Sequence, residues 1–174
     1  METPKRIWWA RSRKLCALER PGGGGRSHRP DRRAAEIEYL KAHGVRVVIS
    51  LMTTRHNLAA YEEAGLDARH VPLASCAEAA EALDDLLRLL RRELRGRGAV
   101  ALHANRHTDL PAAICAAHLY AAHGVDPADA LRAAADAGLS VTPEAAALVG
   151  ADYELVQPRS AIAAATSSGR SVTT

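Results

Sequence analysis

The stretch RVVISL at residues 46–51 decides the fold, because it is a continuous run of apolar and mostly β-branched residues. Such a run is typical of a strand that is buried on both faces, as in a parallel sheet covered by helices. The stretch AVALH at residues 99–103 has the same character and predicts a second buried strand. Between them, RHVPL at residues 69–73 predicts a third, shorter strand.

Helical segments separate these strands and follow the last of them. We expect helices over 57–65, 75–95 and 111–123. Asn57 is expected to cap the first, and Ser75 forms a capping box with Glu78 at the start of the second. Because strands and helices alternate, the sequence predicts an α/β fold with a central, mainly parallel sheet flanked by helices.

The N-terminal part adds two short strands before this alternation begins. IWWA at 7–10 and KLCAL at 14–18 have strand character, and the glycine-rich segment 21–25 must be a loop. A helix is expected from Asp31 to His43, ended by Gly44 in a left-handed conformation. Because side chains alternate along a strand, one of the adjacent tryptophans 8 and 9 is expected to face the core and the other outward.

The C-terminal part predicts two further helices and a tail. Pro127 and Pro143 sit at first-turn positions, preceded by Asp126 and Thr142 as N-caps. We expect residues 1–154 to form one domain and residues 155–174 to form a flexible tail.

The composition narrows the class of protein. The chain has 174 residues, a net charge of +3 and three scattered cysteines, at positions 16, 76 and 115. This length suits one domain, and an odd number of unpaired cysteines fits a reducing, cytoplasmic location. The chain shows neither a secretory signal nor an apolar run of about 18 residues that would span a membrane. The basic residues are spread along the chain, so we expect neither nucleic acid nor membrane as a partner.

Ligands of parallel α/β sheets bind beyond the carboxyl ends of the strands, which directs attention to three loops. These are residues 52–57, 74–77 and 104–110. Titratable and reactive side chains are concentrated there: His56, Cys76, His103, Arg106, His107 and Asp109.

The order and spacing of these segments resemble a known family. GVRVVISL, NLAAYEEAGL, HVPL, a long helix, GAVALH, a loop and an Ala-rich helix are similar to the core of a dual-specificity phosphatase. This family belongs to the cysteine-dependent protein tyrosine phosphatases. The resemblance covers roughly residues 5–150 and implies the phosphatase-like fold.

The resemblance also implies a His-Cys-x5-Arg motif, in which the thiolate attacks phosphorus and the arginine holds the phosphate. Here His103 matches the motif's histidine, but Ala104 stands in place of the cysteine and Leu110 in place of the arginine. Ser75 stands about where an upstream general-acid aspartate is usual. The resemblance therefore predicts a degenerate member, a pseudophosphatase without phosphate hydrolysis.

Physical reasons also disfavour phosphate binding in the family's manner. The segment 105–109 contains no glycine, the residue that most easily turns backbone amides inward around a phosphate. Asp109 places a carboxylate near the positive end of the following helix, and Pro111 removes one amide donor.

Several roles for the loop residues remain open. His107 and Asp109 could form an acid–base pair, or Asp109 could simply cap the helix. His103 could serve with them, as a catalytic residue or in a metal site, but a structural hydrogen bond is the stronger reading, and we expect no metal and no cofactor. Cys76 could be a displaced nucleophile if the helix start lowers its pKa, or a small buried apolar side chain. Arg106 could replace the missing arginine or lie on the surface.

Two functions of different classes follow. In the first, the active-site pocket has been repurposed for a non-phosphorylated small molecule, with acid–base chemistry such as elimination, isomerisation or cyclisation. Its catalytic residues are His107, Asp109 and His103, and its ligand-binding residues are Asn105, Arg106, His56, Ser75, Cys76, Ala104 and Leu110. In the alternative, the scaffold is a non-catalytic protein-interaction or regulatory module with a protein partner.

Overall fold

The structure is a computed structural model that describes residues 3–23, 29–105 and 108–158. Its described part contains one five-stranded sheet with the strand order β1-β2-β5-β3-β4. The strands span Ile7–Arg11 (β1), Leu15–Glu19 (β2), Val45–Ser50 (β3), Asp67–His70 (β4) and Ala99–Ala104 (β5). Only the edge strand β1 is antiparallel, to β2, and every other pairing is parallel.

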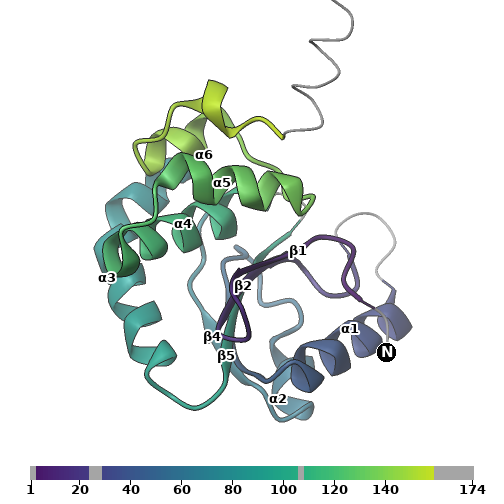
Figure 1. The fold of residues 1–174 in the computed structure, drawn as a ribbon. Helices are drawn as coiled ribbons and strands as arrows, with labels where there is room; N and C mark the ends of the chain where they lie inside the picture. Colours follow the sequence, from purple (N-terminus) through teal and green to yellow (C-terminus); the bar gives the residue numbers. More distant parts are fainter. Residues whose placement is uncertain (1–2, 24–28, 106–107, 159–174) are drawn as a thin grey trace, which may run out of the picture.

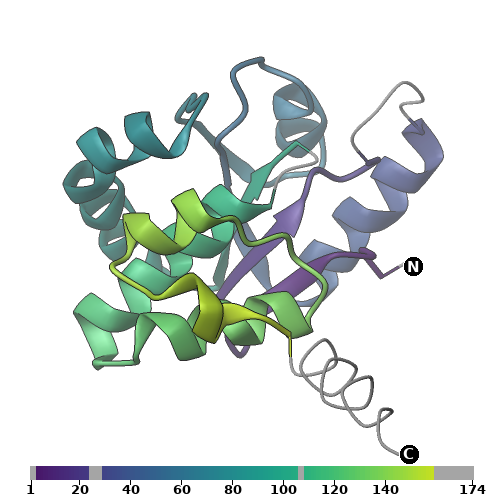
Figure 2. The same ribbon diagram turned by 90° about the horizontal axis from the view of Figure 1, so that it is seen from above.

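Helices cover both faces of the sheet, as the two views show (Figures 1 and 2). One face carries α1 (Pro30–Ala42) and α2 (Leu58–Glu63). The other carries α3 (Cys76–Leu94), α4 (Asp109–His123), α5 (Pro127–Asp136) and α6 (Pro143–Leu148). A short 3-10 helix, Tyr153–Val156, packs against α5 and α6. The molecule is thus the predicted α/β fold with a mainly parallel sheet between two helical layers.

The sheet separates two hydrophobic cores. Along β3, Val47 and Ile49 enter the core under α3–α6, whereas Val48 enters the core under α1 and α2. The two tryptophans alternate as predicted, with Trp8 buried in the first core, but Trp9 does not face outward: it is half-buried and packs against the second core, because both faces of the sheet are covered. The continuous apolar run at 46–51 is explained, because both faces of this strand are covered.

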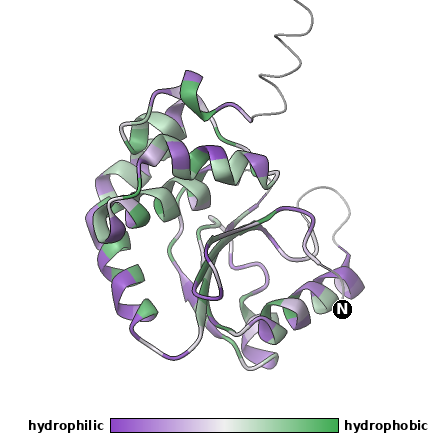
Figure 3. Cartoon of the chain, in the orientation of Figure 1, coloured by the Kyte–Doolittle hydropathy of each residue, from purple (hydrophilic) through white to green (hydrophobic). Residues whose placement is uncertain are grey.

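Helix α4 is the most deeply buried helix of the fold. Its residues from Leu110 to Leu119 are all buried, and it is among the most hydrophobic segments in Figure 3. Alanine at four of these positions, 112, 113, 116 and 117, lets neighbouring backbones approach closely. The helix starts directly after the β5 loop, so a tightly held element carries the residues that follow the candidate loop.

The predicted elements are confirmed with three local differences. Strand β4 spans 67–70 rather than 69–73. Helix α4 begins at Asp109, two residues before Pro111. Asn57 has a left-handed backbone with φ of 69° and its side chain does not cap α2; its Nδ2 instead donates to the Pro21 carbonyl at 2.8 Å. Asn57 bonds this distant carbonyl instead of capping the helix, because Pro21 in the loop of residues 20–23 lies next to the start of α2.

Two predicted features at the ends of elements have clear outcomes. Gly44 takes a φ of 83° directly after the α1 C-cap, the left-handed conformation that the sequence predicts there. Toward the C-terminus, Val156 is buried in the larger core, two residues beyond the predicted domain boundary at 154.

Residues 159–174 lie outside the described residues. Within the described part, none of the helices is long and apolar enough to cross a membrane.

Candidate functional site

The carboxyl ends of β2, β5 and β3 form one edge of the sheet. His103 is the register partner of Ser50 on one side and of Leu18 on the other. The pairing extends past the strand ends, because the Arg20 amide donates to the Ala104 carbonyl at 2.9 Å. This edge therefore places Ala104 between two neighbouring strands, at the position where the family's nucleophile is expected.

His103 is fully buried and uses both ring nitrogens. Its Nδ1 lies 3.4 Å from the Ala104 carbonyl, which can only accept, so Nδ1 carries the proton. Its Nε2 lies 3.1 Å from the Tyr61 hydroxyl, which therefore donates to it. Burial lowers the pKa of His103 to about 4, and the nearby charges of Arg20 and His70 add to this effect. His103 is neutral near pH 7 and acts as a structural hydrogen-bonding residue, so we withdraw it from the acid–base candidates.

Tyr61 belongs to a buried polar network that the sequence analysis missed. Asn57 hydrogen-bonds the Tyr61 hydroxyl and also holds the Pro21 carbonyl. In the loop after β2, the buried Arg20 donates from Nε and Nη2 to the Gly23 carbonyl. The network thus ties the loop of residues 20–23 to α2 and to the end of β5.

Glu36 on α1 completes this network and is also buried. Its Oε2 accepts from the Gly22 amide at 2.8 Å, and its Oε1 pairs with Arg32 at 2.8 Å. A signal in the sequence was available, because Glu36 precedes the buried Leu40 by one helical turn and therefore lies on the apolar face. A carboxylate at such a position needs partners, which are the Gly22 amide and Arg32.

The first turn of α4 is tied to the loop that follows α5. Thr108 is fully buried and its Oγ1 accepts from the Ser140 amide at 2.7 Å. The Thr142 hydroxyl donates to Oδ2 of Asp109 at 3.2 Å and accepts from the Ala145 amide at the start of α6. Thr108, not Asp109, occupies the N-cap position, and it makes no side-chain cap hydrogen bond. The prediction that Asp109 could cap this helix is therefore wrong.

Asp109 and Leu110 give the first turn of α4 an acidic and an apolar side chain, where an anion site would need basic or donor groups. Oδ1 of Asp109 is buried and has no hydrogen-bond partner among the described residues. Leu110 is 8 % exposed and belongs to the larger core. The position that the resemblance assigns to a phosphate-binding arginine is thus occupied by a packed apolar side chain, beside a carboxylate.

Cys76 lies close to this turn, as the sequence predicts for two loops at one edge. Its half-buried thiol has a raised pKa, first because of burial and then because of the carboxylates of Asp109 and Glu144. The hypothesis of a thiolate with a lowered pKa is wrong, because burial, and after it the carboxylates of Asp109 and Glu144, raise the pKa of this thiol. Ser75 is exposed and caps α3: its Oγ accepts from the Glu78 amide at 3.2 Å, and Glu78 accepts from the Ala74 amide. The predicted cap by Ser75 is confirmed, whereas the reciprocal bond of Glu78 goes to the amide of Ala74 rather than to that of Ser75.

The remaining candidates are less constrained. His56 is exposed on the loop before α2, and Asn105 is exposed directly after β5. Arg106 and His107 lie outside the described residues, so the proposed pair of His107 with Asp109 stays a prediction. The structure brings Cys76, Asp109 and Glu144 together, and separately joins His103 to Tyr61.

Known structures share this fold. A variant of TpbA from P. aeruginosa in complex with pTyr has a TM-score of 0.63 and 20% identity, covering 86% of each chain. Human DUSP28 has a TM-score of 0.63 and 18% identity, covering 86% of this chain and 95% of its own. The PTP-2 phosphatase of Cydia pomonella has a TM-score of 0.65 and 15% identity, covering 83% and 88%. No protein-family model and no curated protein matches the sequence.

The fold is therefore that of the dual-specificity and protein tyrosine phosphatases, as the resemblance implies. At these identities the likeness concerns the backbone arrangement alone, and chemistry has to be argued from side chains.

Proposed function

We propose that this chain is a phosphatase-fold protein that does not hydrolyse phosphate esters. We also propose that the loops beyond the carboxyl ends of its strands, residues 52–57, 74–77 and 104–110 (the carboxyl-edge loops), bind a small molecule without a phosphate group. The observation that carries this proposal is the first turn of α4, where Leu110 is buried and Asp109 supplies a carboxylate. Hydrolysis in the family's manner needs a thiolate and a guanidinium, and Ala104 and Leu110 offer neither.

The local charge supports the same conclusion for binding. The carboxylates of Asp109 and Glu144 raise the pKa of Cys76, which means that they disfavour negative charge at that thiol. The same potential opposes a phosphate dianion placed over the start of α4. A helix N-terminus ordinarily attracts anions, but here the carboxylate of Asp109 already occupies the first turn.

The ligand that fits this turn is a hydrogen-bond donor. Oδ2 of Asp109 already accepts from Thr142, whereas the buried Oδ1 has no partner, and a buried carboxylate oxygen gains from a donor. An O–H or N–H group of a ligand can supply it. The pair of His107 and Asp109 that the sequence predicts would move protons in an elimination, isomerisation or cyclisation.

The first test uses phosphate chemistry. The wild type should not hydrolyse 4-nitrophenyl phosphate, and calorimetry with orthovanadate should give no binding heat. A double variant, Leu110→Arg with Asp109→Asn, should give a measurable binding heat with orthovanadate, because it adds a guanidinium and removes a carboxylate. Leu155→Arg, at an exposed position, is the control for added charge and should not bind. Wild-type hydrolysis that Leu110 or Asp109 variants abolish would contradict the proposal.

A second test separates a small-molecule site from the interaction module. Benzylammonium, a cationic hydrogen-bond donor, should shift the NMR signals of residues 104–110 in the wild type, and Asp109→Asn should weaken this effect. Benzoate should leave these signals unchanged. If neither compound affects the loop, the donor-binding site is excluded and the non-catalytic interaction module is the better explanation of the scaffold.

A further inference from the structure

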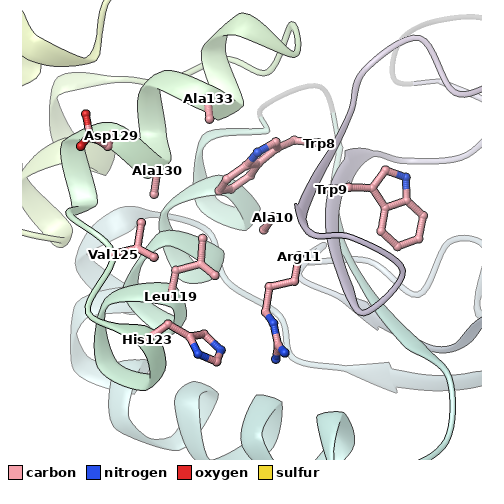
Figure 4. Close-up of a pocket in the computed structure, with 10 residues that line it drawn as sticks. All are labelled: Trp8, Trp9, Ala10, Arg11, Leu119, His123, Val125, Asp129, Ala130 and Ala133. Carbon is pink, nitrogen blue, oxygen red and sulfur yellow. The ribbon is translucent and has the colours of Figure 1, made fainter.

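A groove lies between the edge strand β1 and the helices α4 and α5, and none of its lining residues belongs to the candidate loops (Figure 4). Its volume of about 440 Å³ falls in the range of small-molecule sites. Most of its wall is apolar and comes from Trp8, Ala10, Leu119, Val125, Ala130 and Ala133. The Trp8 indole is 7 % exposed, points toward Ala130 and Ala133, and forms part of the apolar wall against which a ring can pack.

One end of the groove is basic. The Arg11 guanidinium and the His123 imidazole both line it and lie at the same end in Figure 4. Among the described residues, neither has a carboxylate within ion-pair distance. The one acidic lining residue, Asp129, is at the other end and pairs with Arg132 at 2.8 Å. The groove therefore combines an apolar body with an unpaired cationic end.

The buried His118 lies next to His123 at this end of the groove, and the charged groups around it are also basic. The ring of His118 lies 6.1 Å from that of His123, centroid to centroid, and its buried Nε2 has no hydrogen-bond partner within the described part of the chain. Burial lowers the pKa of His118, and His123, Arg11 and Arg91 lower it further. Every charged group that acts on this imidazole is basic, so an anion nearby would relieve their mutual repulsion.

From these contacts we infer that the groove between β1 and α4–α5 binds a small aromatic carboxylate, with its ring against Trp8 and its carboxylate at Arg11 and His123. A planar guanidinium suits a carboxylate because it can donate two parallel hydrogen bonds. The small side chains of Ala130 and Ala133 leave the space that the ring occupies. This inference does not rest on the proposed function, since none of the groove residues belongs to the carboxyl-edge loops.

Calorimetry with 2-naphthoate tests the site in the full chain. The wild type should bind it with a dissociation constant of about 0.1 mM, and the neutral 2-naphthamide about tenfold more weakly. Arg11→Gln should weaken naphthoate binding about tenfold, whereas Arg13→Gln, the same change at an exposed position of the adjacent turn, should not alter it.

A second pair of variants tests the apolar body of the groove. Ala133→Trp fills the groove from an exposed helix position and should abolish naphthoate binding, whereas Ala121→Trp, exposed on α4 away from the groove, should not. Circular dichroism confirms that each variant is folded. The inference is overturned if naphthoate gives no heat at several millimolar, if the amide binds as well as the acid, or if Arg11→Gln and Arg13→Gln behave alike. It is also overturned if Ala133→Trp retains wild-type binding.

Discussion

The two ends of helix α4 carry opposite charge, and a buried histidine beside each end shows what the difference means. At the start, Asp109 and the neighbouring Glu144 are acidic, and His103 has partners for both ring nitrogens. At the other end, His123 and Arg11 are basic, and Nε2 of His118 has no partner. The hydrogen bonds of His103 give it a structural role, whereas the charged groups that lower the pKa of His118 are all basic.

This arrangement agrees with the helix dipole at both ends, because acidic groups stabilise the positive N-terminus and basic groups the negative C-terminus. Under the proposed function, this arrangement would let a phosphatase-like scaffold lack an anion site while keeping its fold. The helix start that would otherwise attract phosphate is occupied by the chain's own carboxylate, while the unpaired cationic groups lie at the groove.

The largest expected effect comes from the middle of α4, which holds the two ends in place. Ile114 is fully buried in the core, so Ile114→Ala leaves a cavity and should lower the free energy of unfolding by about 3 kcal/mol. Urea denaturation followed by circular dichroism measures this loss. Leu155→Ala, at an exposed position, should change stability by less than about 0.5 kcal/mol. Equal losses in both variants would mean that α4 is not the central packing element.

A second prediction uses the pH dependence of stability at the acidic end. The pKa of His103 is 6.5 in an unfolded chain and about 4 in the fold. As pH falls through this interval, the unfolded chain binds a proton that the folded chain does not, so stability decreases. His103 should therefore contribute about 3 kcal/mol near neutral pH that is lost by pH 4.

Denaturation curves measured across this pH interval, for the wild type and for His103→Gln, isolate the contribution. The variant should show a shallower loss of stability on acidification, because its side chain does not titrate. His56→Gln changes an exposed histidine and should keep the wild-type slope. A His103→Gln protein with the wild-type slope would show that this imidazole titrates freely in the fold.

The smallest expected effect concerns the carboxylates around Cys76. Asp109→Asn removes one of the two charges that raise the pKa of this thiol, so the thiolate fraction near neutral pH should increase. Alkylation of Cys76 by iodoacetamide, followed by mass spectrometry, should become about threefold faster. Cys16 and Cys115 are fully buried and should stay unmodified in the folded protein.

Glu63→Gln, which removes an exposed carboxylate from α2, is the matched control and should leave the alkylation rate of Cys76 unchanged. If Asp109→Asn slowed the reaction or had no effect, the acidic character of the α4 start would be wrong, and with it the main argument against an anion at this site.

The scaffold was largely predictable from the sequence because local patterns and burial agree. The β-branched run at 46–51 has apolar side chains on both faces of its strand, so it is stable only between two covering layers. The cap at Ser75 is a local contact between residues three apart. The resemblance also assigns Ala104 and Leu110 to the positions of the family's cysteine and arginine, because the motif has a fixed spacing.

Only the tertiary structure decided which polar residues are used and how. The hydrogen bond between Tyr61 and His103 joins residues 42 apart, and the bond from Thr142 to Asp109 joins residues 33 apart. Arg11 and His123, on opposite walls of the groove, are still further apart in the sequence. A pKa or a binding site depends on the burial and charge that distant segments supply, and spacing along the chain carries no information about either.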